Sequence, residues 1–170
     1  MSEKDLIYEE KVKYAGIFDF KDVYQTAYTW LTDYQYWVEE RTYSEKIKPN
    51  GKEVEIKWIA KRKISDYFRF FLKVDWHIVG MTTVEMTDES GNKIKMNKGQ
   101  FEIKVSAYLE KDYENRWEGN AFGKFLRGTY DRFVIRSRIE QYEDKVAGEL
   151  EEYVAALKSF FAIEGKRVGA

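Results

Sequence analysis

The sequence predicts an α+β fold in which a curved antiparallel β-sheet wraps around one long C-terminal helix. The segment 135–163 is the only long stretch whose apolar residues recur at steps of three and four, the spacing of one helix face. The region 11–110 instead contains several runs in which apolar and polar residues alternate, which is typical of strands with one buried face. Such a sheet must cover its apolar face, and the terminal helix is the only predicted element long enough to do so.

Composition indicates a single domain with a substantial core. The 170 residues are interpreted as one domain, 1–170. Basic and acidic residues number 29 and 30, and this balance gives no general reason to expect nucleic acid as a partner. The absence of cysteine excludes disulfides and thiol chemistry. No stretch approaches the roughly 20 apolar residues of a membrane span and the charged start lacks a signal peptide, so we expect a cytoplasmic protein.

The first predicted elements are a strand, a short helix and a hairpin. Alternation over 11–18 predicts the strand, and Asp19 or Asp22 is suited to cap the helix that follows at about 21–33. Two strand-like segments come next, 36–47 and 53–61, and the turn Pro49-Asn50-Gly51 between them predicts a hairpin.

A second and longer hairpin is predicted around the loop 88–92. Apolar residues keep to even positions over 68–86, but beyond Gly99 on the return arm they occupy odd positions, which requires a bulge or a strand break. Gly80 is expected to face Gly99 across the hairpin, so that both arms bend at one corner. An unbent strand over 67–87 would be roughly 70 Å long at about 3.3 Å per residue, which is far too long for this domain.

The remainder of the chain is predicted to be helical. Aromatic residues in 111–134 have a helical rhythm that glycines weaken, and we interpret this segment as a helical connection. The long helix is expected at 135–163, where Gly148 could permit a kink or a close approach of the sheet. Its predicted buried face consists of Ile135, Ile139, Tyr142, Val146, Leu150, Tyr153, Leu157 and Phe160, widened by Val154 and Phe161.

The run Ile17-Phe18-Asp19-Phe20, which leads into the short helix, and the long helix from Ile135 give an order of elements that resembles the helix-grip superfamily of START-like and plant-pollen-allergen-like domains. The resemblance covers nearly all of the chain in element order and includes no specific motif. It implies an apolar small molecule or lipid held between sheet and helix, and some family members are cyclases, aromatases or chaperone co-factors. The chain departs from the family in having one clear short helix and a long connection at 111–134.

The leading functional hypothesis is a non-catalytic binding domain for a small apolar or aromatic ligand, without a cofactor. The candidate lining residues are Trp58, Phe70, Trp76, Tyr142, Val146 and Tyr153. The alternative is a structural or protein-interaction domain with a fully packed core, which contacts a protein partner or a second copy, because the same aromatic residues could close the gap. A third hypothesis, a cyclase-type enzyme, would need an interior acid or base that strand parity does not supply.

His77, the only histidine, is the natural candidate for proton transfer. Strand parity places it with Asp75 on the charged face of its strand, so we expect a surface residue, and the two side chains could share a hydrogen bond. We predict no catalytic residue and no metal site, because no further ligands have suitable spacing.

Three charged clusters are weaker candidates. A basic cluster at the start of the terminal helix could bind phosphate or single-stranded nucleic acid by charge and by stacking on Tyr130 and Phe133, or it could be solvated and paired with acidic residues such as Glu140. The cluster consists of Lys124, Arg127, Arg132, Arg136 and Arg138. A second basic run consists of Lys61, Arg62 and Lys63. The acidic residues of the terminal helix, expected on its solvated side, are Glu149, Glu151 and Glu152.

Overall fold

The computed structural model describes residues 2–115, 121–133 and 136–168. The elements in chain order are β1 (Glu3–Phe18), α1 (Phe20–Asp33), β2 (Trp37–Lys48), β3 (Gly51–Lys63), β4 (Phe68–Thr87), β5 (Lys93–Lys111), α2 (Ala121–Phe133) and α3 (Arg136–Val168). The five strands form one antiparallel sheet in the order β1-β5-β4-β3-β2.

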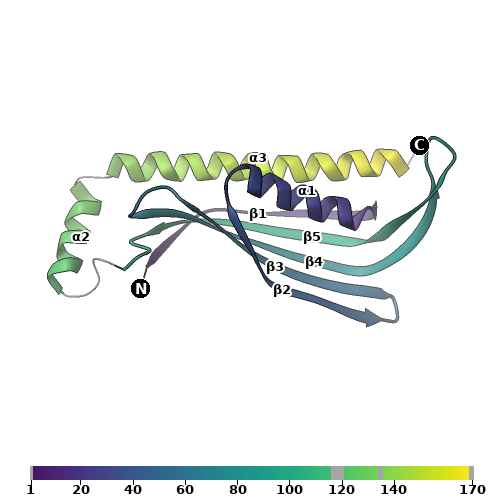
Figure 1. Cartoon of the computed structure of the whole chain (residues 1–170), viewed down its shortest axis with the longest axis horizontal. Helices are drawn as coiled ribbons and strands as arrows, with labels where there is room; N and C mark the ends of the chain where they lie inside the picture. The colour runs from purple at the N-terminus through teal and green to yellow at the C-terminus, as the bar shows by residue number, and fades with distance from the viewer. Residues whose placement is uncertain (1, 116–120, 134–135, 169–170) are drawn as a thin grey trace.

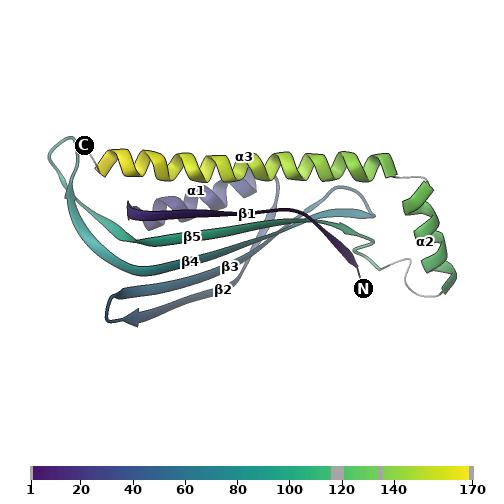
Figure 2. The ribbon, with the colours of Figure 1, turned by 180° about the vertical axis from the view of Figure 1, so that it is seen from behind.

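The sheet curves beneath two helices. Figure 1 shows α3 running along the molecule above β1 and β5, with α1 beside it. Figure 2, from behind, shows β1 in front, directly below α3. The fold class predicted from the sequence, a curved antiparallel sheet with a long C-terminal helix, is confirmed.

Both covering helices bury one apolar face. The helix α1 is capped by Asp19, whose side chain accepts a hydrogen bond from the backbone N–H of Asp22 at 3.2 Å. Its buried residues are Val23, Ala27 and Leu31. The buried residues of α3 include Val146, Leu150, Tyr153, Val154, Leu157 and Phe161. Ile139, Tyr142 and Phe160 are half-buried against the same core, and Ile135 lies outside the described residues.

Four glycines meet where the sheet bends. Gly16 pairs with Gly99, and the β4–β5 register shifts where Gly80 and Met81 lie opposite Gly99, as the sequence predicted. Gly80 has a φ of +65°, in the left-handed region. A Cβ atom on Gly51 would lie 2.8 Å from the carbonyl carbon of Gly80, so the backbones can approach here only because side chains are missing.

The ends of several elements differ from the sequence predictions. β1 begins at Glu3, well before residue 11, and the register shift between Leu6 and Tyr8 explains why its alternation was not recognised. α3 continues to Val168, beyond residue 163. In the connection 111–134, α2 occupies Ala121–Phe133, whereas 116–120 and 134 lie outside the described residues.

Gly148 does not mark a close approach of the sheet. It is exposed, and a Cβ atom built on it would meet nothing within 4 Å. The helix α3 continues through this position. The hypothesis of a close approach is therefore wrong.

Candidate functional site

The six residues predicted to line a ligand site all lie on the inner side of the sheet or on the face of α3 turned toward it. Trp58 comes from β3, Phe70 and Trp76 from β4, and the rest from α3. Trp58, Trp76 and Tyr153 are 1% exposed, Phe70 and Val146 are fully buried, and Tyr142 is half-buried. All of them belong to, or pack against, one continuous hydrophobic core.

Aromatic side chains from α1 contact several of these residues. Trp58 and Trp76 are in contact, with ring centroids 4.8 Å apart, and Tyr24 of α1 lies 5.0 Å from the first and 5.9 Å from the second. Trp30, also on α1, lies 4.8 Å from the ring of Tyr153. The structure therefore brings α1 into the region where a ligand was expected, which the sequence did not predict.

Two buried indole groups differ in their hydrogen bonding. The Nε1–H of Trp58 donates to Glu40 at 3.0 Å, and the hydroxyl of Tyr24 donates to the same carboxylate oxygen at 2.5 Å. Burial, with the Glu40 carboxylate as a further cause, raises the pKa of Tyr24. The Nε1–H of Trp76 is buried and has no hydrogen-bond partner among the described residues.

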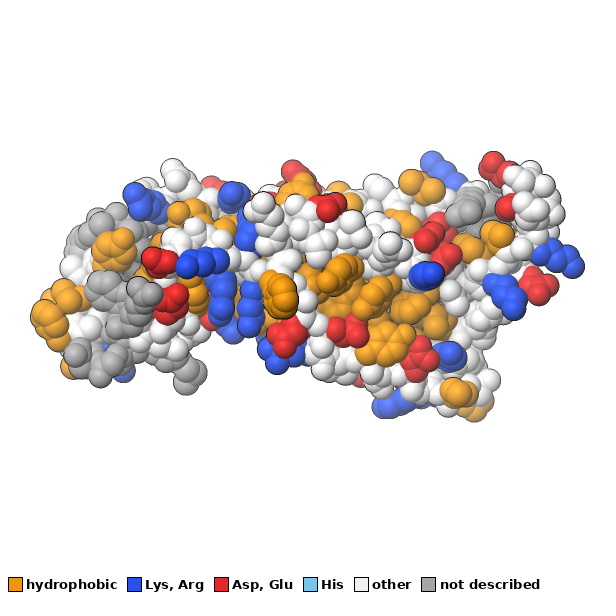
Figure 3. Space-filling view, viewed as in Figure 1, with side chains coloured by type: hydrophobic (Ala, Val, Ile, Leu, Met, Phe, Trp, Pro, Cys, Tyr) orange, Lys and Arg blue, Asp and Glu red, His pale blue; other side chains and the backbone are white. Residues whose placement is uncertain are grey.

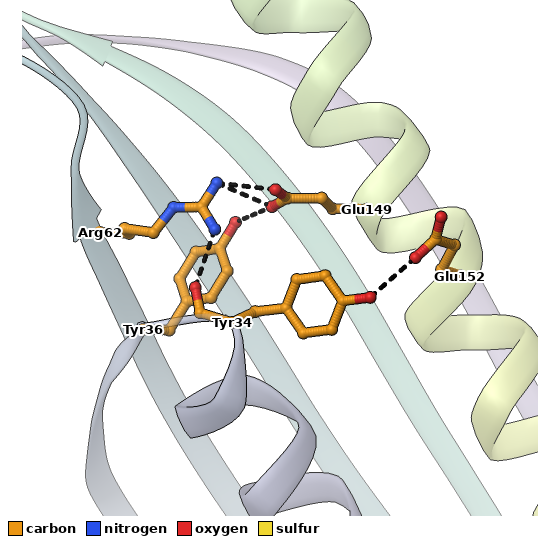
Figure 4. A network of polar contacts seen from close by, with 5 residues as sticks. All are labelled: Tyr34, Tyr36, Arg62, Glu149 and Glu152. Atoms are coloured by element: carbon orange, nitrogen blue, oxygen red, sulfur yellow. Dashed lines mark hydrogen bonds and ion pairs between the residues drawn. The ribbon is translucent and has the colours of Figure 1, made fainter.

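A polar network fastens α3 to the sheet and to the turn after α1 (Figure 4). Arg62 of β3 donates to both carboxylate oxygens of Glu149 at 2.8 and 3.0 Å, and to the carbonyl of Tyr34 at 2.8 Å. The Tyr36 hydroxyl donates to Glu149 at 2.9 Å, and the Tyr34 hydroxyl donates to Glu152 at 2.9 Å. The guanidinium carbon of Arg62 also lies 4.7 Å from the centre of the Tyr36 ring.

This network corrects two sequence predictions. The Arg62 and Glu149 side chains are each only 13% exposed, so Glu149 is not on the solvated side of the helix. Arg62 forms an ion pair with Glu149 of the same chain. The central residue of the basic run 61–63 therefore already has an anionic partner and does not serve as a binding site for another anion. Burial raises the pKa of Tyr36, and the neighbouring Arg62 opposes this effect only in part.

His77 is exposed on the outer face of the sheet, as its parity predicted. Its Nε2 lies 2.9 Å from the carboxylate of Glu53 on the neighbouring strand, which takes the place predicted for Asp75. Hydrogen bonds from Lys48 and, second, from His77 lower the pKa of Glu53 to about 2. These are contacts at a solvated surface, and they place no acid or base in the interior.

The basic cluster is divided between two environments. Arg127 is 8% exposed, and its guanidinium lies 2.8 Å from Glu3 and 4.0 Å from Asp112. It therefore anchors α2 to the body of the protein. The exposed members of the cluster are Lys124, Arg132, Arg136 and Arg138.

Four hollows formed by the described residues are lined by side chains other than those of the predicted site. They measure about 320, 410, 540 and 630 Å³. The hollow of about 410 Å³ involves His77, Gln100 and Glu102, and the one of about 540 Å³ lies between α1 and Phe160 of α3. None of the six predicted residues lines any of these four hollows.

Several large apolar side chains are exposed on the surface, including some on β2 and some on α2. On β2, an edge strand of the sheet, Trp37 is 75% and Ile47 is 87% exposed. On α2, Phe122 is 68% and Phe125 is 67% exposed, with Leu126 beside them at 37%. Figure 3 shows hydrophobic side chains gathered at the α2 end of the molecule and below α1, with charged side chains around them.

The described residues contain neither a cluster of metal ligands nor a membrane-spanning helix. Within 2–115, 121–133 and 136–168, no group of three or more His, Cys, Asp or Glu residues is arranged to hold a metal ion. In the same ranges, no helix combines the length and the apolar character needed to cross a membrane. No protein-family model, no curated protein and no solved structure matches this chain.

Proposed function

We propose that this chain is a non-catalytic interaction domain with a packed core, which binds its partner through the surface. The observation that supports this most directly is the position of Tyr24, whose ring contacts both Trp58 and Trp76. These are the side chains that a ligand in the predicted site would have to contact. Close packing of aromatic rings leaves little room for a further molecule.

The surface supports the same proposal. Interaction sites are rich in exposed aromatic and large aliphatic side chains, and Trp37, Ile47, Phe122 and Phe125 are each more than 60% exposed. Charged residues surround these side chains, and such a polar rim is typical of sites that form and release complexes.

A second candidate function is favoured by one observation, the buried Nε1–H of Trp76, which has no partner among the described residues. A buried N–H group without an acceptor is costly, and a ligand oxygen could satisfy it. In this candidate function the domain is a carrier, like the ligand-binding members of the helix-grip superfamily. Its small apolar ligand has one hydrogen-bond acceptor atom and lies against Trp58 and Trp76. Such a ligand would have to displace Tyr24.

Native mass spectrometry of the purified full chain distinguishes the two functions. The packed domain is expected to give the mass of the polypeptide alone, and Tyr24→Ala is expected to lower the melting temperature without releasing any small molecule. A stoichiometric apolar compound that leaves on denaturation would contradict the packed domain and support the carrier. Gln25→Ala is the control, because Gln25 is on the same helix at an exposed position.

A further inference from the structure

The helix α2 presents two faces of different chemistry. On one face, Arg127 contacts Glu3 at 2.8 Å, and the ring of Tyr130 lies 6.0 Å from that of Tyr67 in an edge-to-face arrangement. These contacts fix the orientation of the helix on the body. Phe122 and Phe125 lie on another face, where they are 68% and 67% exposed.

The exposed face is a continuous apolar stripe. Phe122, Phe125 and Leu126 are separated by steps of three and one, so their side chains lie on one side of the helix. We call these three residues the α2 stripe. Figures 1 and 2 show α2 at one end of the molecule, set across the direction of α3. The stripe thus belongs to a projecting end rather than to a groove.

Several cationic side chains are exposed at the same end of the molecule as the α2 stripe. Lys124 and Arg132 of α2 and Arg136 and Arg138 at the start of α3 are all exposed. Glu140 lies 3.7 Å from Arg136, and both side chains of this pair are well solvated at 65% and 82% exposed. A solvated pair of this kind contributes little to stability.

We propose that α2 docks on an anionic phospholipid surface, with the α2 stripe inserted at the level of the headgroups and the four cations against the lipid phosphates. A helix with aromatic and leucine residues on one side and lysine and arginine around them is suited to lie in a membrane interface. A projecting apolar ridge fits a deformable bilayer, whereas protein partners usually offer such a ridge a groove. This inference rests on the proposed function, an interaction domain that binds through its surface, and it identifies the partner of the α2 surface.

A site-specific probe can test this docking directly, because the chain contains no cysteine. Phe125→Cys, labelled with an environment-sensitive fluorophore, is mixed with vesicles of phosphatidylcholine alone or with equal parts of phosphatidylglycerol. We expect a blue shift and increased emission only with the anionic vesicles, and less of both at high salt. Ser90→Cys, at an exposed position in the loop between β4 and β5, is the control and is expected to remain unchanged.

Co-sedimentation of the unlabelled chain gives the magnitude. Arg136→Gln with Arg138→Gln is expected to weaken binding about 30-fold, since each basic residue near an anionic surface contributes about fivefold. Phe122→Ser with Phe125→Ser is expected to weaken it by at least about tenfold. Lys93→Gln with Lys95→Gln removes the same charge from exposed positions at the start of β5, and is expected to change binding less than about twofold.

Several results would overturn the docking. One is that the chain binds both vesicle types equally, and another is that the double lysine variant weakens binding as much as the double arginine variant. A third is that polyglutamate binds as tightly as anionic vesicles. A fourth is that the chain forms a dimer without lipid and that Phe125→Ser dissociates this dimer. The melting temperature of each variant checks that it is folded. A co-purified ligand would refute the packed domain whatever the vesicles do, whereas a ligand-free chain that ignores vesicles would refute the docking alone.

Discussion

The ion pair between Arg62 and Glu149 is expected to be one of the strongest single contacts between α3 and the sheet. Glu149→Ala removes two charge-assisted hydrogen bonds from Arg62 and one from Tyr36. Arg62 then keeps only the carbonyl of Tyr34 and its contacts with two aromatic rings. Breaking a buried pair on one side costs about 3–5 kcal/mol, and we expect about 3 kcal/mol because both side chains are 13% exposed.

Urea unfolding of a double-mutant cycle measures this contact. Arg62→Met keeps an apolar stem and is also expected to cost about 3 kcal/mol, whereas the double variant should cost clearly less than the sum. A coupling free energy of about 2 kcal/mol is expected. The control is Glu151→Ala, which makes the same change of helix propensity at an exposed position of α3. In thermal unfolding, Glu149→Ala is expected to lower the melting temperature by roughly 6–12 °C.

The reasoning would be refuted by either of two results. If Glu149→Ala and Glu151→Ala unfold within about 0.5 kcal/mol of each other, the network does not stabilise the fold. If both single variants are costly but their effects add, each side chain acts separately and the ion pair does not hold α3 to β3.

Three further predictions concern other parts of the fold. Gly148→Ala is expected to raise the free energy of unfolding by about 1 kcal/mol, because this exposed helix position has open space around it, and an unchanged or lower value in urea would contradict this. Trp58→Phe is expected to lower the free energy of unfolding in urea by about 1.5 kcal/mol more than Trp76→Phe does. Only Trp58 donates a hydrogen bond, to Glu40, that the substitution removes. Equal losses for the two variants would contradict this reasoning. Burial raises the pKa of Tyr36, so above about pH 10 the unfolded chain loses the hydroxyl proton of this residue while the folded protein keeps it. The free energy of unfolding must therefore fall as the pH rises above about 10. Tyr36→Phe should reduce the slope of this fall by about 1.4 kcal/mol per pH unit, and an unchanged slope would exclude Tyr36 as its cause.

The sequence predicted those features that depend on a local period or a local backbone requirement. The steps of three and four in α3 indicated its buried face, and the structure buries Val146, Leu150 and Tyr153 there. The parity change near Gly99 indicated a corner, because an alternating strand cannot change faces without a bulge. The helical spacing can be seen within one helix, and the parity change can be seen within one strand. Neither pattern requires knowledge of contacts between distant segments.

Contacts between distant segments were not predicted, although part of the signal was present. Arg62 has the same parity as Trp58 and Ala60, so alternation already placed it on the inner face of the sheet. An inward cation needs a partner. The partner, Glu149, is 87 positions away in the chain, and nothing in the acidic run 149–152 distinguishes it from its neighbours without the packing angle of α3.

The contacts of α1 at the candidate site could not be predicted from the sequence for a similar reason. The apolar stripe of α1 consists of Val23, Tyr24, Ala27, Tyr28 and Leu31 and predicts a packed face, but it does not indicate which part of the protein covers this face. In the structure α1 lies beside α3, which brings Tyr24 and Trp30 onto the rings predicted to hold a ligand. A sheet that faces one long helix can be inferred from sequence, whereas the placement of a second helix beside it depends on the tertiary arrangement.

Sequence alone also leaves the orientation of α2 open. The helical spacing of its aromatic residues is equally compatible with an apolar face turned to the core and with one turned to a partner. The contacts of Arg127 and Tyr130 separate the two cases, because they fix the side of α2 that meets the body. Phe122 and Phe125, which would be buried if the stripe faced the core, remain more than 60% exposed. Exposed aromatic side chains among cations are costly to maintain in water unless another surface covers them, so the described surface of α2 is the part of this molecule most in need of a partner.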